Sequence, residues 1–172
     1  YDVKIIQVST DCIFSGKDGD YRESDIPDAE DLYGRSKYLG EVSERNVLTL
    51  RKSSIGLELT NKHGLVEWFL NQSGSVKGYK KAIYSGFSTS YLAYLIEEIM
   101  VKHSSLSGLY HIASEPLSKY DLLTRLEERL ENFSIDIIED DKIIIDRSLN
   151  STKLVEQTGL SIPNWNVMLD DL

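Results

Sequence analysis

Tyr33 and Lys37, in the stretch YGRSK, are four positions apart, which on a helix places both side chains on one face. A tyrosine is a weak acid, but a neighbouring ammonium group favours its phenolate form and lets it exchange a proton near neutral pH. Such a pair can protonate a carbonyl oxygen while a hydride reaches the carbon. Thr10 offers a hydroxyl that could hold the same oxygen, with Ser9 beside it. The same spacing is also common on solvated helix faces, so the surrounding sequence must decide.

The segments around these residues alternate between strands and helices. Runs of β-branched residues predict strands, and apolar residues at every third or fourth position predict helices. The predicted strands are 3–9, 46–54, 81–87, 108–114 and two short pieces at 135–140 and 142–146; the predicted helices are 31–45, 64–72, 88–103, 118–131 and 150–159. This alternation favours an α/β fold with parallel pairing. The glycine-containing, acidic segment 10–31 is predicted to be a long loop, and loops of this length are usually either functional or disordered.

The composition narrows the class of protein. The 172 residues carry 28 acidic and 19 basic side chains, a net charge of −9, which argues against nucleic acid or an anionic membrane as the main partner. The chain contains one cysteine, Cys12, and so has no disulfide framework, which favours the cytoplasm. Its three histidines, His63, His103 and His111, have no metal-ligand spacing, so we predict no metal site.

Several motifs occur in a characteristic order. They are VSTDCIFSG, YRESDIP and LYGRSKYLGE, followed by LRKSSIG, SGLYHIASEPLSKYDL, DRSLNSTKL and a terminal IPNW. Together they resemble the extended short-chain dehydrogenase/reductase superfamily, and within it the dTDP-4-dehydrorhamnose reductase branch of sugar-nucleotide reductases. The resemblance covers nearly the whole chain. It implies the C-terminal part of a Rossmann-like, doubly wound parallel sheet together with a smaller substrate-binding α/β region.

The resemblance also implies roles for particular residues. Thr10, Tyr33 and Lys37 would form the catalytic set, with Tyr33 as proton donor and Thr10 orienting the sugar carbonyl. Lys37 would favour the phenolate of Tyr33 and hydrogen-bond the nicotinamide ribose. The residues implied in cofactor binding are Ser9, Tyr33, Lys37, Ser53 and Ser54.

The resemblance also implies substrate-binding residues, and most of them have an alternative role. Asp11 would lie close to the sugar, although Cys12 stands where the branch commonly has an aromatic residue. Trp68 could line the pocket or belong to the core. Ser88 and Thr89 could position substrate or cap a helix. Arg147 could contact the nucleotide diphosphate or pair with an aspartate at the surface.

The expected glycine-rich turn for a dinucleotide is missing from the sequence. Gly16 and Gly19 have no apolar helix behind them, so we interpret them as turn residues. We therefore expect residues 1–60 to be the catalytic part of an incomplete Rossmann-like domain. Residues 61–172 would be mostly substrate-binding, with segments that return to the same sheet. Such a chain is expected to bind NAD(P)H poorly and to be inactive alone, and its sheet edge could allow homo-oligomers to form.

The predicted function is NAD(P)H-dependent reduction of a 4-keto sugar nucleotide. A dehydratase is disfavoured because Asp11 is followed by Cys12 and Ile13 instead of a second acid. Two alternatives stay open: a non-catalytic regulatory or binding subunit of the same fold, and a sugar-nucleotide epimerase.

Overall fold

The computed structural model describes residues 3–60 and 64–172. Its first sheet contains β1 (Ile5–Thr10), β2 (Val47–Lys52) and β6 (Gly108–His111) in the order β1-β2-β6, and all three strands are parallel. Thr10 is therefore the register partner of Lys52. The carboxyl ends of parallel strands meet at one edge of a sheet, which is where α/β proteins bind ligands.

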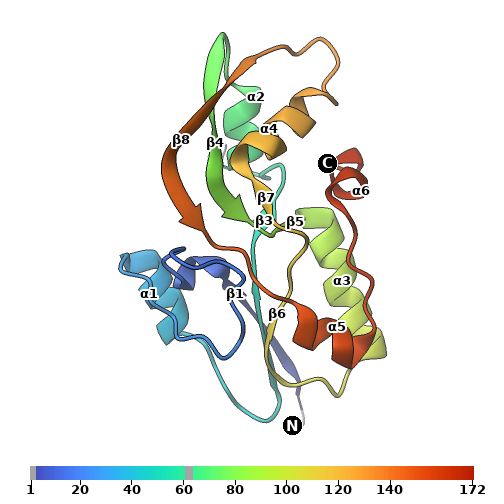
Figure 1. The fold of residues 1–172 in the computed structure, drawn as a ribbon. Helices are drawn as coiled ribbons and strands as arrows, with labels where there is room; N and C mark the ends of the chain where they lie inside the picture. Colours follow the sequence, from blue (N-terminus) through green and yellow to red (C-terminus); the bar gives the residue numbers. More distant parts are fainter. Residues whose placement is uncertain (1–2, 61–63) are drawn as a thin grey trace.

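A second sheet lies beyond the carboxyl ends of the first (Figure 1). Its long strands, β4 (Ser75–Tyr84) and β8 (Asp136–Asp146), are parallel, and the short β7 (Leu117–Ser118) pairs antiparallel with β4. A two-stranded pair of β3 (Ser54–Ile55) and β5 (Phe87–Ser88) connects the two regions.

The described α-helices are α1 (Leu32–Leu39), α2 (Leu65–Leu70), α3 (Thr89–Lys102), α4 (Lys119–Glu127), α5 (Thr152–Thr158) and α6 (Trp165–Asp170), with a 3-10 turn at Asp11–Ile13. Four of these six α-helices begin at a residue whose side chain accepts a hydrogen bond from the first turn, and α2 and α5 lack such a cap. Asp31 accepts a hydrogen bond from the Gly34 amide, and Ser118 accepts one from the Asp121 amide. Gly159, with φ of +69°, ends α5.

The buried apolar side chains form two clusters. The larger joins Leu48 and Leu50 of β2 to α3, through Leu95 and Ile99, and reaches Trp165. The smaller contains Ile13, Phe14, Tyr21, Ala113 and Leu149. Phe14 and Tyr21 stack with ring centroids 4.1 Å apart, so the segment between β1 and α1 has a small core of its own and is held in place by it.

The α/β class with parallel pairing is confirmed, whereas several boundaries differ from the prediction. The helix predicted for 31–45 ends at Leu39, because Glu41 turns away to bind Arg51. The two short pieces predicted near 135–146 are one strand, β8, because both pair with β4. The strand predicted for 81–87 begins at Ser75, and α6 was not predicted.

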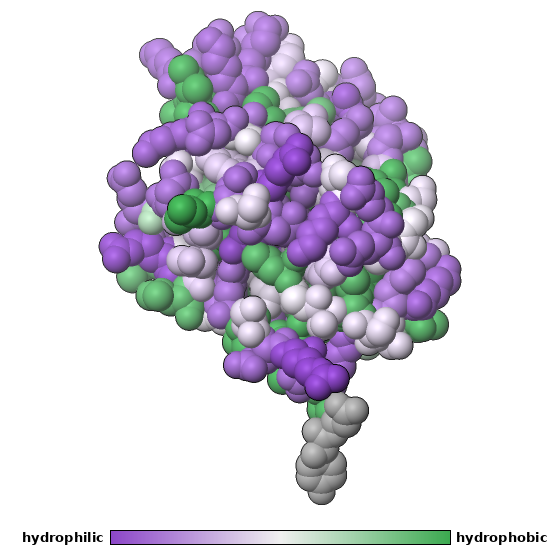
Figure 2. All heavy atoms as spheres, turned by 60° about the horizontal axis from the view of Figure 1, so that its bottom comes forward, coloured by the Kyte–Doolittle hydropathy of each residue, from purple (hydrophilic) through white to green (hydrophobic). Residues whose placement is uncertain are grey.

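Hydrophilic residues cover most of the face shown in Figure 2, with apolar residues in small separate groups. Within residues 3–60 and 64–172, none of the helices combines the length and apolar character that crossing a membrane would require.

Candidate active site

Thr10 and Asp11 lie at the carboxyl end of β1, and both are buried. The Thr10 hydroxyl accepts a hydrogen bond from the Cys12 amide (3.2 Å) and donates one to the Asp11 carboxyl group (3.1 Å). Burial raises the pKa of the Asp11 carboxyl, while hydrogen bonds from Thr10, Cys12 and Ser53 and the charge of Arg147 act in the opposite direction. The site therefore contains a desolvated carboxyl group surrounded by donors.

Tyr33 and Lys37 project from α1, which packs directly on the backbone that follows Thr10. Gly34 makes this packing possible, because a Cβ atom there would overlap the carbonyl oxygen of Cys12. The Lys37 ammonium donates to the Val8 carbonyl oxygen of β1 at 3.3 Å. Tyr33 is 56% exposed, and its hydroxyl forms no hydrogen bond with any described residue. The structure thus brings Lys37 to the strand that carries Thr10, and Tyr33 lies one turn earlier on the same helix.

Lys52 is a residue of this site that the sequence analysis missed. It ends β2 directly beside Thr10, and its ammonium donates to the Ser54 hydroxyl at 2.8 Å. Burial lowers the pKa of Lys52, and the nearby charge of Lys37 lowers it further, although Asp11 opposes both. It forms no ion pair in the described ranges. The sequence did contain a signal for Lys52, because it lies near the end of the predicted strand 46–54. If that strand pairs in parallel with the strand before Thr10, the lysine lies beside Thr10.

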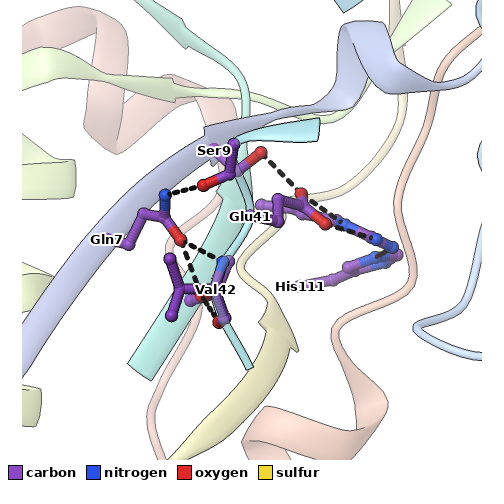
Figure 3. A network of polar contacts seen from close by, with 8 residues as sticks. Gln7, Ser9, Glu41, Val42 and His111 are labelled. Carbon is purple, nitrogen blue, oxygen red and sulfur yellow. Dashed lines mark hydrogen bonds and ion pairs between the residues drawn. The ribbon is translucent and has the colours of Figure 1, made fainter. Parts of the chain in front are cut away.

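A buried polar network lies on the other side of β1, and Figure 3 shows its arrangement. We call Ser9, Glu41, Arg51 and His111 the anchor network. The Arg51 guanidinium donates to both carboxylate oxygens of Glu41 (2.9 and 2.7 Å), and the Ser9 hydroxyl donates to the same carboxylate (2.6 Å). Ser9 was predicted to contact the cofactor, but in this structure its hydroxyl donates its proton to Glu41.

His111 completes the anchor network from β6. Its Nδ1 lies 2.8 Å from the Tyr21 carbonyl oxygen, which can only accept, so Nδ1 carries the proton. Nε2 then accepts from Arg51 at 3.3 Å. Burial lowers the pKa of His111, and the charge of Arg51 adds to this effect, while Glu23 opposes it. The sequence analysis predicted neither His111 nor Glu41 as a site residue. Both bond to Arg51, and these contacts arise only when β2 pairs with β6 and the segment after α1 packs on β2.

The remaining predicted residues fall into two groups. Ser53 lies close enough to Asp11 to affect the pKa of its carboxyl, and the Ser54 hydroxyl accepts a hydrogen bond from Lys52. A role for both serines in cofactor binding stays a prediction. Arg147 also reaches the site, since its guanidinium donates to the Phe14 carbonyl oxygen (3.0 Å) and contacts the Cys12 sulfur (3.5 Å). Arg147 lines a hollow of about 550 Å³ between the 15–17 turn, the start of α1 and the end of β8.

Ser88, Thr89 and Trp68 have other contacts in this structure. The Ser88 hydroxyl accepts from the Tyr91 amide at 3.4 Å and caps α3. Thr89 packs against Gly56. Trp68 lies on α2, which is next to α4 and apart from α1 (Figure 1), and its ring centroid is 4.4 Å from the Lys119 ammonium. A substrate role for these three residues stays a prediction.

The described residues contain no group of three or more His, Cys, Asp or Glu side chains arranged to hold a metal ion. His63 lies outside the described residues. Cys12 is a free cysteine, and burial and the charge of Asp11 raise the pKa of its thiol.

The described residues suit the nicotinamide end of a dinucleotide cofactor better than its pyrophosphate. The exposed Tyr33 and the adjacent Lys37 suit the end that carries the reacting ring. Gly16 (φ +86°) and Gly19 (φ +72°) are turn glycines packed on Ile145 and Asp146 of β8, so they do not form a pyrophosphate cradle at a helix N-terminus.

Comparison with known proteins identifies a family and individual relatives. Residues 1–171 match the family described as the RmlD substrate binding domain. A dTDP-4-dehydrorhamnose reductase of Aggregatibacter actinomycetemcomitans is 35% identical over 131 residues, which are 68% of this chain and 44% of that protein. The spore coat polysaccharide biosynthesis protein SpsK of Bacillus subtilis is 31% identical over 129 residues, 72% of this chain and 45% of that protein. The chain thus spans about half the length of the curated relatives it matches.

Solved structures share the fold. A dTDP-4-dehydrorhamnose reductase of Bacillus anthracis, in complex with NADP, superposes with a TM-score of 0.81 at 20% identity and covers 98% of this chain and 64% of that one. A hypothetical dTDP-4-dehydrorhamnose reductase of Sulfolobus tokodaii gives a TM-score of 0.78 at 28% identity, covering 98% of this chain and 63% of that one.

Proposed function

Because the chain belongs to the RmlD substrate binding domain family, we propose that it supplies the substrate-binding and proton-donating part of a 4-keto sugar-nucleotide reductase of the dTDP-4-dehydrorhamnose type. The observation that carries the proposal is the packing of α1 on the end of β1. Through the contact between Gly34 and the Cys12 carbonyl, α1, which carries Tyr33 and Lys37, packs against the backbone that follows Thr10.

Each of these residues has a distinct task in the proposed reaction. The Tyr33 hydroxyl is exposed and free to donate its proton to the carbonyl oxygen of the sugar. The Thr10 hydroxyl, which donates to Asp11 in this structure, would turn its proton to that oxygen and orient it. Lys37 is held against β1 by the Val8 carbonyl and places a positive charge on the same helix face as Tyr33. Arg147 would attract the diphosphate of the substrate.

The proposed cofactor is NADP or NAD, which when bound would supply the hydride. Tyr33 and Lys37 would hold its reacting end, with Ser53 and Ser54 at the neighbouring strand ends. We also propose that the full protein is a short-chain dehydrogenase/reductase of the cytoplasm, a location supported by the free thiol of Cys12. Homo-oligomers could form through the edge strand β1.

The test compares two tyrosines of α1 in the longest protein that contains this chain. With dTDP-4-dehydrorhamnose as substrate, Tyr33→Phe is expected to lower the rate of NADPH oxidation by about 10²–10⁴-fold. Tyr38→Phe, on the same helix, should leave the rate within about twofold. The isolated 172-residue chain is expected to show no turnover and no saturable effect on NADPH fluorescence.

Three results would change the proposal. Turnover that survives Tyr33→Phe would remove Tyr33 as proton donor. Nucleotide-sugar binding without turnover in the wild-type protein would favour a non-catalytic binding subunit. Conversion of the sugar without net consumption of NADPH would favour an epimerase.

A further inference from the structure

Lys52 ends β2 at the carboxyl edge of the parallel sheet, beside Thr10 of β1. The preceding register partners, Ser9 and Arg51, both bond to Glu41 and so face the anchor network. Because successive residues of a strand point to opposite faces of the sheet, Thr10 and Lys52 share the other face. Paired strands lie about 4.8 Å apart, so these two side chains leave the sheet as neighbours.

Lys52 is also the point at which β2 reaches the surface. The preceding residues of the strand, 47–51, are buried, whereas Lys52 is partly exposed, so a ligand at this edge of the sheet can contact it. A lysine ammonium has several N–H donors, and one of them bonds to the Ser54 hydroxyl at 2.8 Å. No carboxylate in residues 3–60 and 64–172 forms an ion pair with Lys52. Donors of a partly buried cation are therefore left for a ligand.

The surroundings of Lys52 concentrate positive charge in an acidic protein. The chain has a net charge of −9, yet Lys37 on α1, Lys52 on β2 and Arg147 after β8 all reach the residues that follow β1 or the strand itself. Among the described residues, none of these three cations forms an ion pair with a carboxylate. An excess of unpaired cations at one edge of a sheet suits a ligand group that carries negative charge.

In the proposed reaction, such a charge develops on the reacting oxygen of the sugar. The carbonyl carbon accepts a hydride from the reduced nicotinamide, the π electron pair moves onto the oxygen, and Tyr33 supplies the proton that completes the hydroxyl. The ketone is reduced and the nicotinamide is oxidised. Thr10 offers this oxygen only a neutral donor. An ammonium beside Thr10 instead binds the oxygen most strongly when the oxygen is negatively charged.

We propose that Lys52 donates a hydrogen bond to the carbonyl oxygen of the sugar, beside Thr10, and stabilises the negative charge that forms there during hydride transfer. Lys52 is thereby a further catalytic residue, in addition to Thr10, Tyr33 and Lys37. Lys37 has a different task, because its ammonium is held by the Val8 carbonyl oxygen on β1. This inference rests on the proposed function and extends it, since it adds a donor from β2 to the set carried by β1 and α1.

The experiment measures kcat and KM for NADPH oxidation with dTDP-4-dehydrorhamnose, in the longest protein that contains this chain. Removing a donor that acts mainly in the transition state lowers kcat and leaves substrate binding in place. Lys52→Met is therefore expected to lower kcat about 10²–10³-fold, with KM within about threefold of wild type. Lys52→Arg keeps the positive charge and should recover part of the lost rate. Lys142→Met is the matched control, because Lys142 is exposed on β8, and it should change neither constant.

The other outcomes separate the two proposals. If wild type turns over and Lys52→Met keeps its kcat, or raises KM alone, the role of Lys52 is overturned and the proposed function stays intact. The same holds if Lys52→Arg is no faster than Lys52→Met. Both variants should melt within about 4 °C of wild type, and a larger drop in both would make Lys52 a structural residue and overturn the inference. A wild-type protein without turnover would contradict the proposed function, and this inference would fall with it.

Discussion

The polar groups on the two sides of β1 differ in how fully they are bonded. In the anchor network, the guanidinium of Arg51, the carboxylate of Glu41 and both ring nitrogens of His111 all have partners inside the protein. At the candidate active site, the hydroxyl of Tyr33 has no partner among the described residues. Strands β1 and β2 therefore carry fully bonded polar groups of the anchor network within a few residues of the candidate active site, where a hydroxyl has no partner.

The difference separates groups that hold the fold from groups that are available to a ligand. A fully bonded buried network stabilises one arrangement of the chain and leaves nothing for a substrate to bind. Donors and acceptors with spare capacity contribute little to folding, but they can bind strongly to a ligand that completes them. Substitutions in the two regions should therefore affect different measurements.

The largest expected effect is on the anchor network. Arg51→Met removes the only cation bonded to the nearly buried Glu41 carboxylate in the described residues, and an uncompensated buried charge costs about 3–5 kcal/mol. Urea denaturation followed by circular dichroism measures the loss in free energy of unfolding. Arg45→Met is the matched control, because Arg45 is exposed, and it should change the stability by less than about 0.5 kcal/mol. A loss of less than about 1 kcal/mol in Arg51→Met would show that the network is not a structural anchor.

An intermediate effect is expected from acid. The folded-state pKa of His111 is lowered, so the unfolded chain binds more protons, and the free energy of unfolding falls as the pH drops below the ordinary histidine value of about 6.5. Each unit of difference between the folded and unfolded pKa values corresponds to about 1.4 kcal/mol. Denaturation at pH about 7.5 and about 5.5 measures the loss.

The control for this prediction is a second histidine. The loss of stability in acid should shrink in His111→Gln and persist in His103→Gln. Asp11, whose raised pKa acts with the opposite sign, is present in all three proteins and cancels in the comparison. An unchanged loss in His111→Gln would place the titrating group elsewhere.

The smallest expected effect on stability is that of Tyr33→Phe at the candidate active site. Tyr33 is 56% exposed and its hydroxyl is unbonded within the described ranges, so Tyr33→Phe should change the free energy of unfolding by less than about 0.5 kcal/mol. The same urea series measures it. Destabilisation comparable to that of Arg51→Met would erase the distinction between the two sides of β1, because it would make Tyr33 a structural residue.

The features that were predictable from the sequence depend on local chemistry. The parallel α/β class follows from the alternation of apolar runs, and the helix starts follow from Asp31, Ser88 and Ser118, which cap their own helices. The pairing of Tyr33 with Lys37 on one helix needs only their spacing.

The features that could not be predicted depend on contacts between distant segments. The end of α1 at Leu39 is set by the bond from Glu41 to Arg51 on β2, and β8 is continuous because of its partner β4, some sixty residues earlier. Lys52 belongs to the site through its register with Thr10, which depends on the pairing of β1 with β2.

Gly34 shows that the spacing of Tyr33 and Lys37 does not describe the YGRSK motif completely. The stretch YGRSK reads as a tyrosine and a lysine with three interchangeable residues between them, yet only Arg35 and Ser36 face solvent. Gly34 is buried against the Cys12 carbonyl, and any side chain there would push α1 away from β1. For this chain the motif is therefore better written with a fixed glycine after the tyrosine. The close packing of α1, which carries the proposed proton donor, on the end of β1 therefore depends on the Cβ atom that glycine lacks.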